Sequence, residues 1–380
     1  MQLPVDIKAL LDETTNIKAA HETEIAVSVY IDESAPADLA AHVRNAFASS
    51  LPTVRMTLTY LGAGFIPQPT DDIAVIVAGS SDGIGGYADS LRSVGVPVMV
   101  VASQPDAVAQ RAREAGHPIP QHDLIAPDAR SEPEPDAAEE ARSVADHASK
   151  GLPIGQWSGK DLLFGRKDPG ASAQQGYVEA EPSPTAAAEG PLELTEERAR
   201  DLDTKMGRWI VSVCRDKRLA YAIAFPFVRR PLARDAVQNT ALQNAAVGLV
   251  PFLPGADLPI MTLNQAKMVL QIGAAYGQQI DKGRWKEIAA VVGVAYLSRG
   301  LVRRLVAAVP VLGFAIRAGV AYGTTAAMGY GVIEYFEGGQ NVTGVANVIE
   351  RAAATGTKAV ATVRSAAQKY VPALDSGSTR

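Results

Sequence analysis

Residues 73–86 read Ile-Ala-Val-Ile-Val-Ala-Gly-Ser-Ser-Asp-Gly-Ile-Gly-Gly, and this stretch decides the fold class. Residues 73–77 form a continuous apolar run with the length and the Val and Ile content of a buried strand. A turn rich in Gly and Ser follows, and the pattern of residues 86–94 is typical of a helix. A strand, a tight turn and a helix in this order form the repeating unit of a parallel sheet covered by helices.

The same alternation of strand and helix patterns extends over residues 25–125. Strands that alternate with helices indicate βα units. We expect strands at residues 25–31, 54–61, 73–77, 97–102 and 124–126, and helices at residues 38–48, 86–94 and 105–115. The sequence therefore predicts an α/β, Rossmann-like domain over residues 1–127.

The turn after the strand supports three incompatible functional interpretations, of which the first is a dinucleotide site. Gly79-x-x-x-Gly83-x-Gly85 resembles the fingerprint of short-chain dehydrogenases, whose glycines let backbone amides approach a pyrophosphate at a helix N-terminus. This resemblance implies Gly79, Gly83 and Gly85 as cofactor-binding residues. The same family needs Tyr-x-x-x-Lys for proton transfer, and none of the eleven tyrosines has a lysine four positions on.

The second interpretation is a nucleophile elbow. Gly79-Ser-Ser81-Asp-Gly83 matches Gly-x-Ser-x-Gly between a strand and a helix, which would make Ser81 a nucleophile. A histidine and an acid should then follow on later strands of the same sheet. Of the later histidines, His117 and His122 lie in Pro-rich surroundings and His147 lies near the expected linker, where no βα pattern continues.

The third interpretation is a degenerate GTPase-like domain. Residues 71–106 resemble the stretch of Era-like GTPases that leads to the guanine-specificity motif Asn-Lys-x-Asp, of which Ser103-Gln-Pro-Asp106 keeps only the aspartate. The first turn of such a GTPase carries Gly-x-x-x-x-Gly-Lys-Ser/Thr, which holds phosphates and positions Mg²⁺. Residues 32–38 read Asp-Glu-Ser-Ala-Pro-Ala-Asp instead, and their acids would repel phosphate. This resemblance implies the architecture without hydrolysis.

Metal and cofactor chemistry finds little support in the rest of the chain. The single cysteine, Cys214, and the five histidines show no spacing typical of metal ligands. We therefore expect no metal, no cofactor and no catalytic residue. The alternative that stays open is a nucleotide- or NAD-binding enzyme that uses the loop from Gly79 to Gly85.

The charge of the chain is strongly asymmetric, although the net charge is only −5. Residues 1–127 carry 7 basic and 15 acidic groups, and residues 128–204 carry 8 and 17. Residues 205–380 carry 21 and 9, a net charge of +12. Residues 128–194 are acidic and rich in Pro and Ala, which indicates a linker. A basic and apolar C-terminal half suits an anionic membrane face, and with only 6% aromatic residues we expect no nucleic-acid partner.

From residue 195 onward the pattern is helical, with helices expected at residues 195–216, 218–228, 232–250, 262–279, 286–309, 314–336 and 347–371. A capping box, Thr262-Leu-Asn-Gln265, predicts the start of the fourth of these helices. Residues 220–230, 239–245, 252–268, 272–277, 309–329 and 335–337 together resemble a bacterial domain family of unknown function. That family is often fused to Era-like GTPases, and some of its members are described as inner-membrane proteins.

The resemblance covers about residues 205–338 and implies a fold and a kind of partner protein rather than an activity. It predicts an all-α, GTPase-associated domain at residues 195–338, which an amphipathic helix and tail at residues 339–380 follow. The expected partners are anionic lipid and either a GTPase or a second copy of the chain. The expected function is that of a non-enzymatic accessory, scaffold or regulatory protein, on the cytoplasmic face of the bacterial inner membrane or embedded in it.

Small residues recur every four positions in residues 315–331, which predicts close helix packing within a bilayer. They are Ala315, Gly319, Gly323, Ala327 and Gly331. A span needs about 20 predominantly apolar residues, and the charge-free stretch 318–333 is shorter than that. Hairpins that enter or lie on a membrane, or a buried helical bundle, are therefore expected rather than simple spans. Asp257 and Arg317 are the charged residues of this region that we expect to have a polar functional role.

We predict that the α/β domain, residues 1–127, does not hydrolyse GTP. The absence of Gly-x-x-x-x-Gly-Lys-Ser/Thr removes the phosphate-binding lysine and the Mg²⁺-binding hydroxyl together. Release of phosphate from GTP measures the activity. Turnover above background, abolished by a point substitution within residues 32–38, would contradict this prediction.

Overall fold

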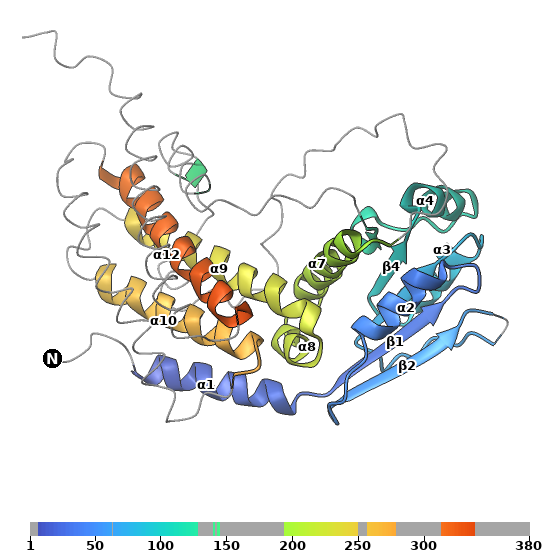
Figure 1. Ribbon diagram of the computed structural model, residues 1–380, viewed down its shortest axis with the longest axis horizontal. Coiled ribbons are helices and arrows are strands. Elements are labelled where there is room, and N and C mark those ends of the chain that lie inside the picture. The colour runs from blue at the N-terminus through green and yellow to red at the C-terminus, as the bar shows by residue number, and fades with distance from the viewer. Residues whose placement is uncertain are drawn as a thin grey trace, which may run out of the picture.

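A computed structural model describes residues 7–62, 64–127, 140, 143–144, 194–249, 257–278 and 313–338 (Figure 1). The predicted linker falls outside these residues except at 140, 143, 144 and 194. The predicted helices at residues 286–309 and 347–371 also lie outside the described residues. The structure described here is therefore that of the α/β region and of six helices associated with it.

The α/β region contains a parallel five-stranded sheet with the strand order β2-β1-β3-β4-β5. The strands are β1 (Ile25–Ile31), β2 (Val54–Tyr60), β3 (Ile73–Ala78), β4 (Val98–Ala102) and β5 (Leu124–Ile125). Every residue of the three central strands β1, β3 and β4 is buried, which explains their continuous apolar runs. The predicted α/β fold is confirmed.

Helices cover both faces of this sheet. On one face, α3 (Ile84–Ser93) and α4 (Pro105–Glu114) pack against the even-numbered residues of β3 and β4. On the other face, α2 (Ala37–Ala46) packs against the odd-numbered residues of β1. These three helices confirm the predicted βα units. A short 3-10 helix, η1 (Gln121–Asp123), precedes β5.

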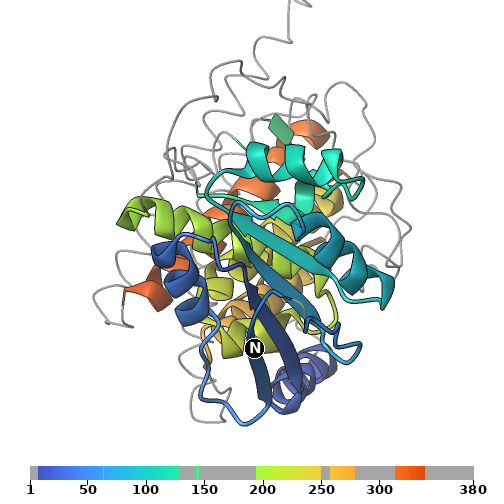
Figure 2. The ribbon, with the colours of Figure 1, turned by 90° about the vertical axis from the view of Figure 1, so that its right-hand side faces the viewer.

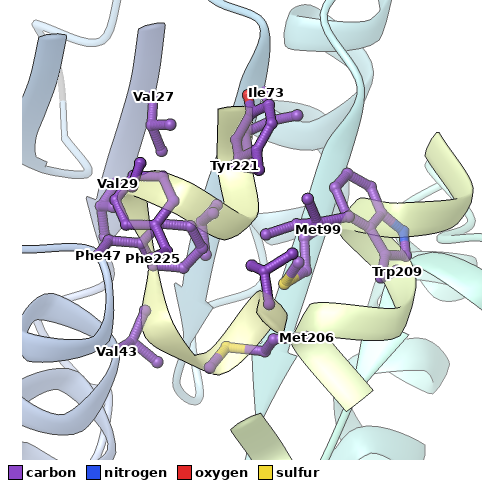
Figure 3. Packing of buried hydrophobic residues seen from close by; sticks show 14 of the residues in the cluster. Val27, Val29, Val43, Phe47, Ile73, Met99, Met206, Trp209, Tyr221 and Phe225 are labelled. Carbon is purple, nitrogen blue, oxygen red and sulfur yellow. The ribbon is translucent and has the colours of Figure 1, made fainter. Parts of the chain in front are cut away.

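The first two helices of the C-terminal half complete the face of the sheet that α2 covers only in part. Side chains of α7 (Glu196–Val213) and α8 (Arg218–Ala224) join one hydrophobic cluster with β1, β3 and β4. Figure 3 shows Met206 and Tyr221 of these helices against the side chains of the sheet. From the α/β end, the sheet lies in front of the C-terminal helices (Figure 2). The sheet and the C-terminal half therefore share a core, so the test for GTP hydrolysis is best made on the full chain.

Polar contacts reinforce this packing at three places. Trp209 Nε1 donates to Asp123 Oδ1 at 3.0 Å in a buried hydrogen bond. Lys217 Nζ lies 2.7 Å from Oδ1 of Asp72. The other carboxylate oxygen of Asp72, Oδ2, accepts a hydrogen bond from the backbone amide of Ala26 at 2.9 Å. His42 on α2 lies 2.7 Å from Asp203 on α7, and this hydrogen bond raises the pKa of His42 above its ordinary value. Charged and polar side chains thus fix how the helices sit on the sheet.

The remaining helices form a second core beyond α7 and α8. They are α9 (Pro226–Leu249), α10 (Asp257–Ala275) and α12 (Gly313–Glu337). An N-terminal helix that the sequence pattern did not predict, α1 (Ile7–Glu22), places the buried Ile17 against α10 (Figure 1). The all-α nature of the described C-terminal region is confirmed.

Two prolines explain where the predicted helix boundaries were wrong. Pro231 lies inside α9 instead of preceding it, and the carbonyl of Phe227, four residues earlier, lies against Gly207 of α7. A Cβ on Gly207 would stand 2.8 Å from that oxygen. Helix α10 begins at Asp257, before the predicted capping box that starts at Thr262. The helix can include Pro259 because this residue lies in the first turn, where backbone N–H groups have no intrahelical partner to lose.

We predict that Phe225→Ala lowers the free energy of unfolding by about 3–5 kcal/mol. Phe225 is fully buried, and its ring lies 5.3 Å from that of Phe47, between α8 and the α/β region. Urea denaturation followed by circular dichroism measures the loss, and both halves should unfold in a single transition. Ile66→Ala is the control because that side chain is 70% exposed. A loss as small as that of the control would contradict a shared core.

Candidate functional site

The carboxyl edge of the sheet is where this fold places ligands. The strand order reverses direction between β1 and β3, and open α/β sheets bind ligands outside the carboxyl ends of the strands at such a switch point. Two loops meet there, residues 32–36 after β1 and residues 79–83 after β3. The predicted cofactor-binding glycines lie in the second loop and in the first turn of α3.

Close packing accounts for two of these three glycines. A Cβ on Gly79 would lie 2.3 Å from the carbonyl carbon of Ser34, so the two loops touch at this point. A Cβ on Gly85 would lie 2.3 Å from the carbonyl oxygen of His117. Gly83 precedes α3 and accepts the amide of Tyr87 at 3.1 Å. Gly79 and Gly85 are thus needed for contacts within the chain, whatever else the loop binds.

A buried carboxylate, that of Asp32, occupies the centre of the switch point. Asp32 is 4% exposed and accepts hydrogen bonds from Ser81 Oγ at 2.6 Å, Ser34 Oγ at 2.7 Å and Gly79 N at 2.9 Å. Burial alone would raise the pKa of Asp32, but these hydrogen bonds outweigh it and hold the pKa below its ordinary value. Asp32 is therefore a stable buried anion.

The anion uses donors that a nucleotide phosphate would otherwise use. In Rossmann-like sites the backbone amides of the glycine-rich turn bind phosphate oxygens. Here the amide of Gly79 donates to Asp32, and the amide of Ser80 donates to Ser34 Oγ at 2.8 Å. A phosphate at this position would have to displace a negatively charged side chain. The sequence indicated that the acids of residues 32–38 would repel phosphate, and the structure adds that one of them is bonded to the turn itself.

The same contacts bear on the interpretation of Ser81 as a nucleophile. Ser81 Oγ donates to Asp32 rather than to a histidine. Two of the described histidines are engaged elsewhere, His42 with Asp203 and His117 with Asp89 Oδ2 at 2.8 Å. The arrangement thus pairs the hydroxyl of Ser81 with a carboxylate of lowered pKa, which is a weak base for proton abstraction.

Arg111 of α4 is a residue of this site that sequence reasoning missed. Its Nη2 donates to the carbonyl of Gly79 at 2.9 Å, and its Nε lies 3.9 Å from Asp82 Oδ1. Arg111 is 32 residues from Gly79, whose carbonyl it binds, and Ser34 is 46 residues from Ser80, whose amide it accepts. No local spacing in the sequence therefore marks either residue. Together with Asp32 they hold the turn from both sides.

The predicted stripe of small residues on α12 is buried where the structure describes it. Gly319, Gly323, Ala327 and Gly331 are all buried. A close approach of α12 to α9 is found at Gly329, outside the predicted stripe, where a Cβ would lie 2.4 Å from Val237 Cγ2. The side chains of Asp257, Ala315 and Arg317 lie outside the described residues, so their predicted roles remain predictions.

Buried amide side chains link the three C-terminal helices. Asn244 Nδ2 of α9 and Gln265 Nε2 of α10 each donate to Thr325 Oγ1 of α12 at 2.9 Å. Asn264 Nδ2 donates to Asn244 Oδ1 at 3.0 Å. Buried polar groups of this kind are costly unless they are hydrogen-bonded, so the network favours one register of the three helices.

The described residues contain no group of three or more His, Cys, Asp or Glu side chains that could hold a metal ion. In the described parts of the chain, no helix is both long enough and apolar enough to cross a membrane.

No family model, no curated protein and no solved structure matches this sequence. The interpretation of the site therefore depends on its geometry.

We predict that Asp32→Asn lowers the free energy of unfolding at pH 7 by roughly 1–3 kcal/mol. The reason is that the NH₂ group of asparagine would face hydrogen-bond donors of the glycine- and serine-rich loop, which then lose their acceptor. The pKa of Asp32 is lowered in the folded state, so its contribution is present above the unfolded pKa of about 3.9 and is lost as the pH falls through the folded pKa. The difference from the wild type should therefore narrow as the pH falls below about 4.

Urea unfolding at a series of pH values measures this effect. Asp82→Asn is the matched control, since the Asp82 side chain is in the same loop and 86% exposed. An Asp32→Asn difference that stays constant down to pH 3, or that equals the control at pH 7, would contradict the assigned role.

Proposed function

We propose that this protein is a non-enzymatic scaffold or regulatory protein that associates with membranes through its C-terminal half. The observation that carries the first part is the Asp32 carboxylate bonded to the glycine- and serine-rich turn at the switch point. A turn that binds its own chain no longer needs a nucleotide to satisfy its amides. The α/β region then serves as a rigid platform for protein contacts.

The alternative, a nucleotide- or NAD-binding enzyme that uses Gly79–Gly85, has weaker support. The chain has neither the phosphate-binding lysine of GTPases nor the Tyr-x-x-x-Lys of short-chain dehydrogenases. At the switch point, Arg111 is the nearby cation, and it bonds the carbonyl of Gly79 rather than pointing into an anion site. Saturable binding of GTP or NAD to the full chain would favour this alternative over the scaffold.

Charge supports the membrane part of the proposal. Residues 205–380 carry a net charge of +12, against −8 for residues 1–127. Each basic group near an anionic membrane surface contributes about 1 kcal/mol, so several together give useful affinity even if only some of them face lipid. The C-terminal helices hold their buried amides in an internal network, and a folded bundle of this kind can lie on a surface without crossing it.

The resemblance of residues 205–338 to a GTPase-associated domain family suggests a GTPase as the protein partner. The chain resembles such domains, and its own Gly79–Gly83 loop is bonded to Asp32 rather than free for a nucleotide. These features suit a subunit that acts together with an active GTPase. This part of the proposal depends on the resemblance alone. The bacterial inner membrane is the proposed location, on its cytoplasmic face or within it.

We predict that the full chain sediments with vesicles that contain anionic lipid and not with zwitterionic vesicles. The double substitution Arg303→Gln and Arg304→Gln should weaken binding by on the order of tenfold, because it removes two basic groups from the basic half. The double substitution Arg44→Gln and Arg113→Gln is the matched control, since it changes the net charge equally but in the acidic half, at exposed positions.

Salt separates two modes of binding in the same assay. A surface-bound chain should be released as the ionic strength rises, because screening shortens the electrostatic field to about 8 Å at physiological salt. An inserted helical hairpin should be retained. Equal binding to both kinds of vesicle, or equal losses in the two double variants, would contradict an electrostatic mode, and no binding at all would overturn the membrane proposal.

A further inference from the structure

In the part of the chain that the structure describes, the outer edge of β2 is the unprotected edge of the sheet. At the opposite edge, β5 has two residues and is flanked by α7, where Lys205 Nζ donates to the carbonyl of Ala126 at 3.0 Å. Strand β2 has seven residues and pairs with β1 without a bulge, and no described strand lies on its other side. Natural edge strands are normally protected by lysine, proline, bulges or covering segments.

The sequence of β2, Val-Arg-Met-Thr-Leu-Thr-Tyr, contains neither lysine nor proline. Its single charged residue, Arg55, is bound within the chain, since its Nη2 lies 3.1 Å from Asp71 Oδ1 and 3.0 Å from Thr70 Oγ1. No charge on the strand therefore opposes the approach of a second strand.

Apolar side chains of β2 share one face and differ in burial along it. Val54 and Met56 are half-buried and pack against the core beneath α2. Leu58 and Tyr60 follow on the same face, because side chains of a strand alternate, and they are 40% and 61% exposed. One end of the strand is thus an apolar surface partly covered by its own chain, and the other end exposes apolar side chains.

Hydrogen bonds with β1 show which backbone groups of β2 face outward. Ile25 N donates to the carbonyl of Thr53, and Leu61 N donates to the carbonyl of Ile31, both at 2.9 Å. The odd-numbered residues of β2 therefore direct their backbone groups toward β1. Backbone direction alternates along a strand, so the amides and carbonyls of Met56, Leu58 and Tyr60 point to the free edge.

We propose that β2 pairs antiparallel with β2 of a second copy of this chain, about a two-fold axis that passes between the two Thr57 residues. This register pairs Met56 with Leu58 of the second copy, and both residues have outward backbone groups, as a hydrogen-bonded pair requires. It also places Val54 opposite Tyr60 of the second copy, where the Val54 carbonyl accepts from the Tyr60 amide, while the Val54 amide keeps its own bond to the carbonyl of Leu51 at 3.1 Å. The two sheets then form one continuous sheet.

Self-complementarity of the side chains favours a second copy over another partner. A two-fold axis perpendicular to the sheet keeps each face on the same side, so exposed Leu58 packs beside half-buried Met56 of the second copy, and exposed Tyr60 beside half-buried Val54. Arg55 lies opposite Thr59, so no like charges meet. Centring the axis on Thr57 pairs all seven residues of the strand, whereas centring it on Met56 or Leu58 leaves residues at the ends unpaired.

Two cysteine variants of the full chain test this register. In a non-hydrogen-bonded pair the Cα atoms lie about 4.5 Å apart, within the range of a disulfide, so Thr57→Cys should crosslink across the axis. Thr59→Cys is the matched control, because the two copies of residue 59 would be offset by four residues, about 14 Å along the strand. Thr59 is also more exposed than Thr57, so random collision would favour the control.

The chain is purified in mild detergent, oxidised gently and analysed on a non-reducing gel. Cys214 is present in both variants and in the wild type, and burial raises the pKa of its thiol to about 12, which keeps it largely protonated and slow to react. We expect most of Thr57→Cys to run as a covalent dimer, while Thr59→Cys and the wild type stay at background. Crosslinking of Thr59→Cys equal to or above that of Thr57→Cys would overturn the proposal.

A proline substitution provides a second test without cysteine. Leu58→Pro removes an amide that points to the free edge, where proline is tolerated, and so should leave the fold and its circular dichroism unchanged. The protein mass from light scattering should be twice the 39.9 kDa of one chain for the wild type and should fall to one chain for Leu58→Pro. A monomeric wild type, as expected if another segment or protein occupies the edge, would overturn the proposal, as would a dimeric Leu58→Pro. Neither result depends on membrane binding.

Discussion

A parallel sheet must be buried on both faces, and most of this structure follows from how the chain meets that requirement. The N-terminal region supplies α3 and α4 for one face but only α2 for the other. The uncovered part of that second face lies over β1, β3 and β4, and α7 and α8 fill it with large side chains such as Trp209 and Tyr221. The C-terminal half is therefore part of the fold of the sheet, and its remaining helices are built outward from α7 and α8.

Because of this arrangement, the individual strands and helices could be predicted from the sequence, but the contacts between elements far apart in the chain could not. Runs of Val and Ile identified β1, β3 and β4, because buried strands of a parallel sheet are apolar throughout. The same runs say nothing about which helices cover them. Trp209 and Phe225 read as residues of a helical domain, and only their contacts with Asp123 and Phe47 show that they belong to the core of the sheet.

Helix boundaries and the candidate site were predictable to different degrees. Pro231 and Pro259 appeared in the sequence to separate helices, but both lie within helices. Pro231 is inside α9 and packs closely against Gly207 of α7. Pro259 is in the first turn of α10. At the site, the spacing of Gly79, Gly83 and Gly85 located the turn correctly. The spacing could not show that Asp32, 47 residues earlier, is bonded to its amides, because that contact depends on β1 and β3 being neighbours in the sheet.

Dimerisation through β2 would also affect how the chain meets a membrane. A two-fold axis through β2 runs perpendicular to the sheet, so the faces covered by α7 and α8 stay on the same side in both copies. The described helices α9, α10 and α12, which pack beyond α7 and α8, would then lie on one side of the dimer. Two weak electrostatic attachments to one surface act with a high effective concentration, so such a pair would bind more strongly than either copy alone. If both proposals hold, pairing at the edge of the sheet would give the α/β region a role in membrane association, since it would set the orientation of the halves proposed to touch the lipid.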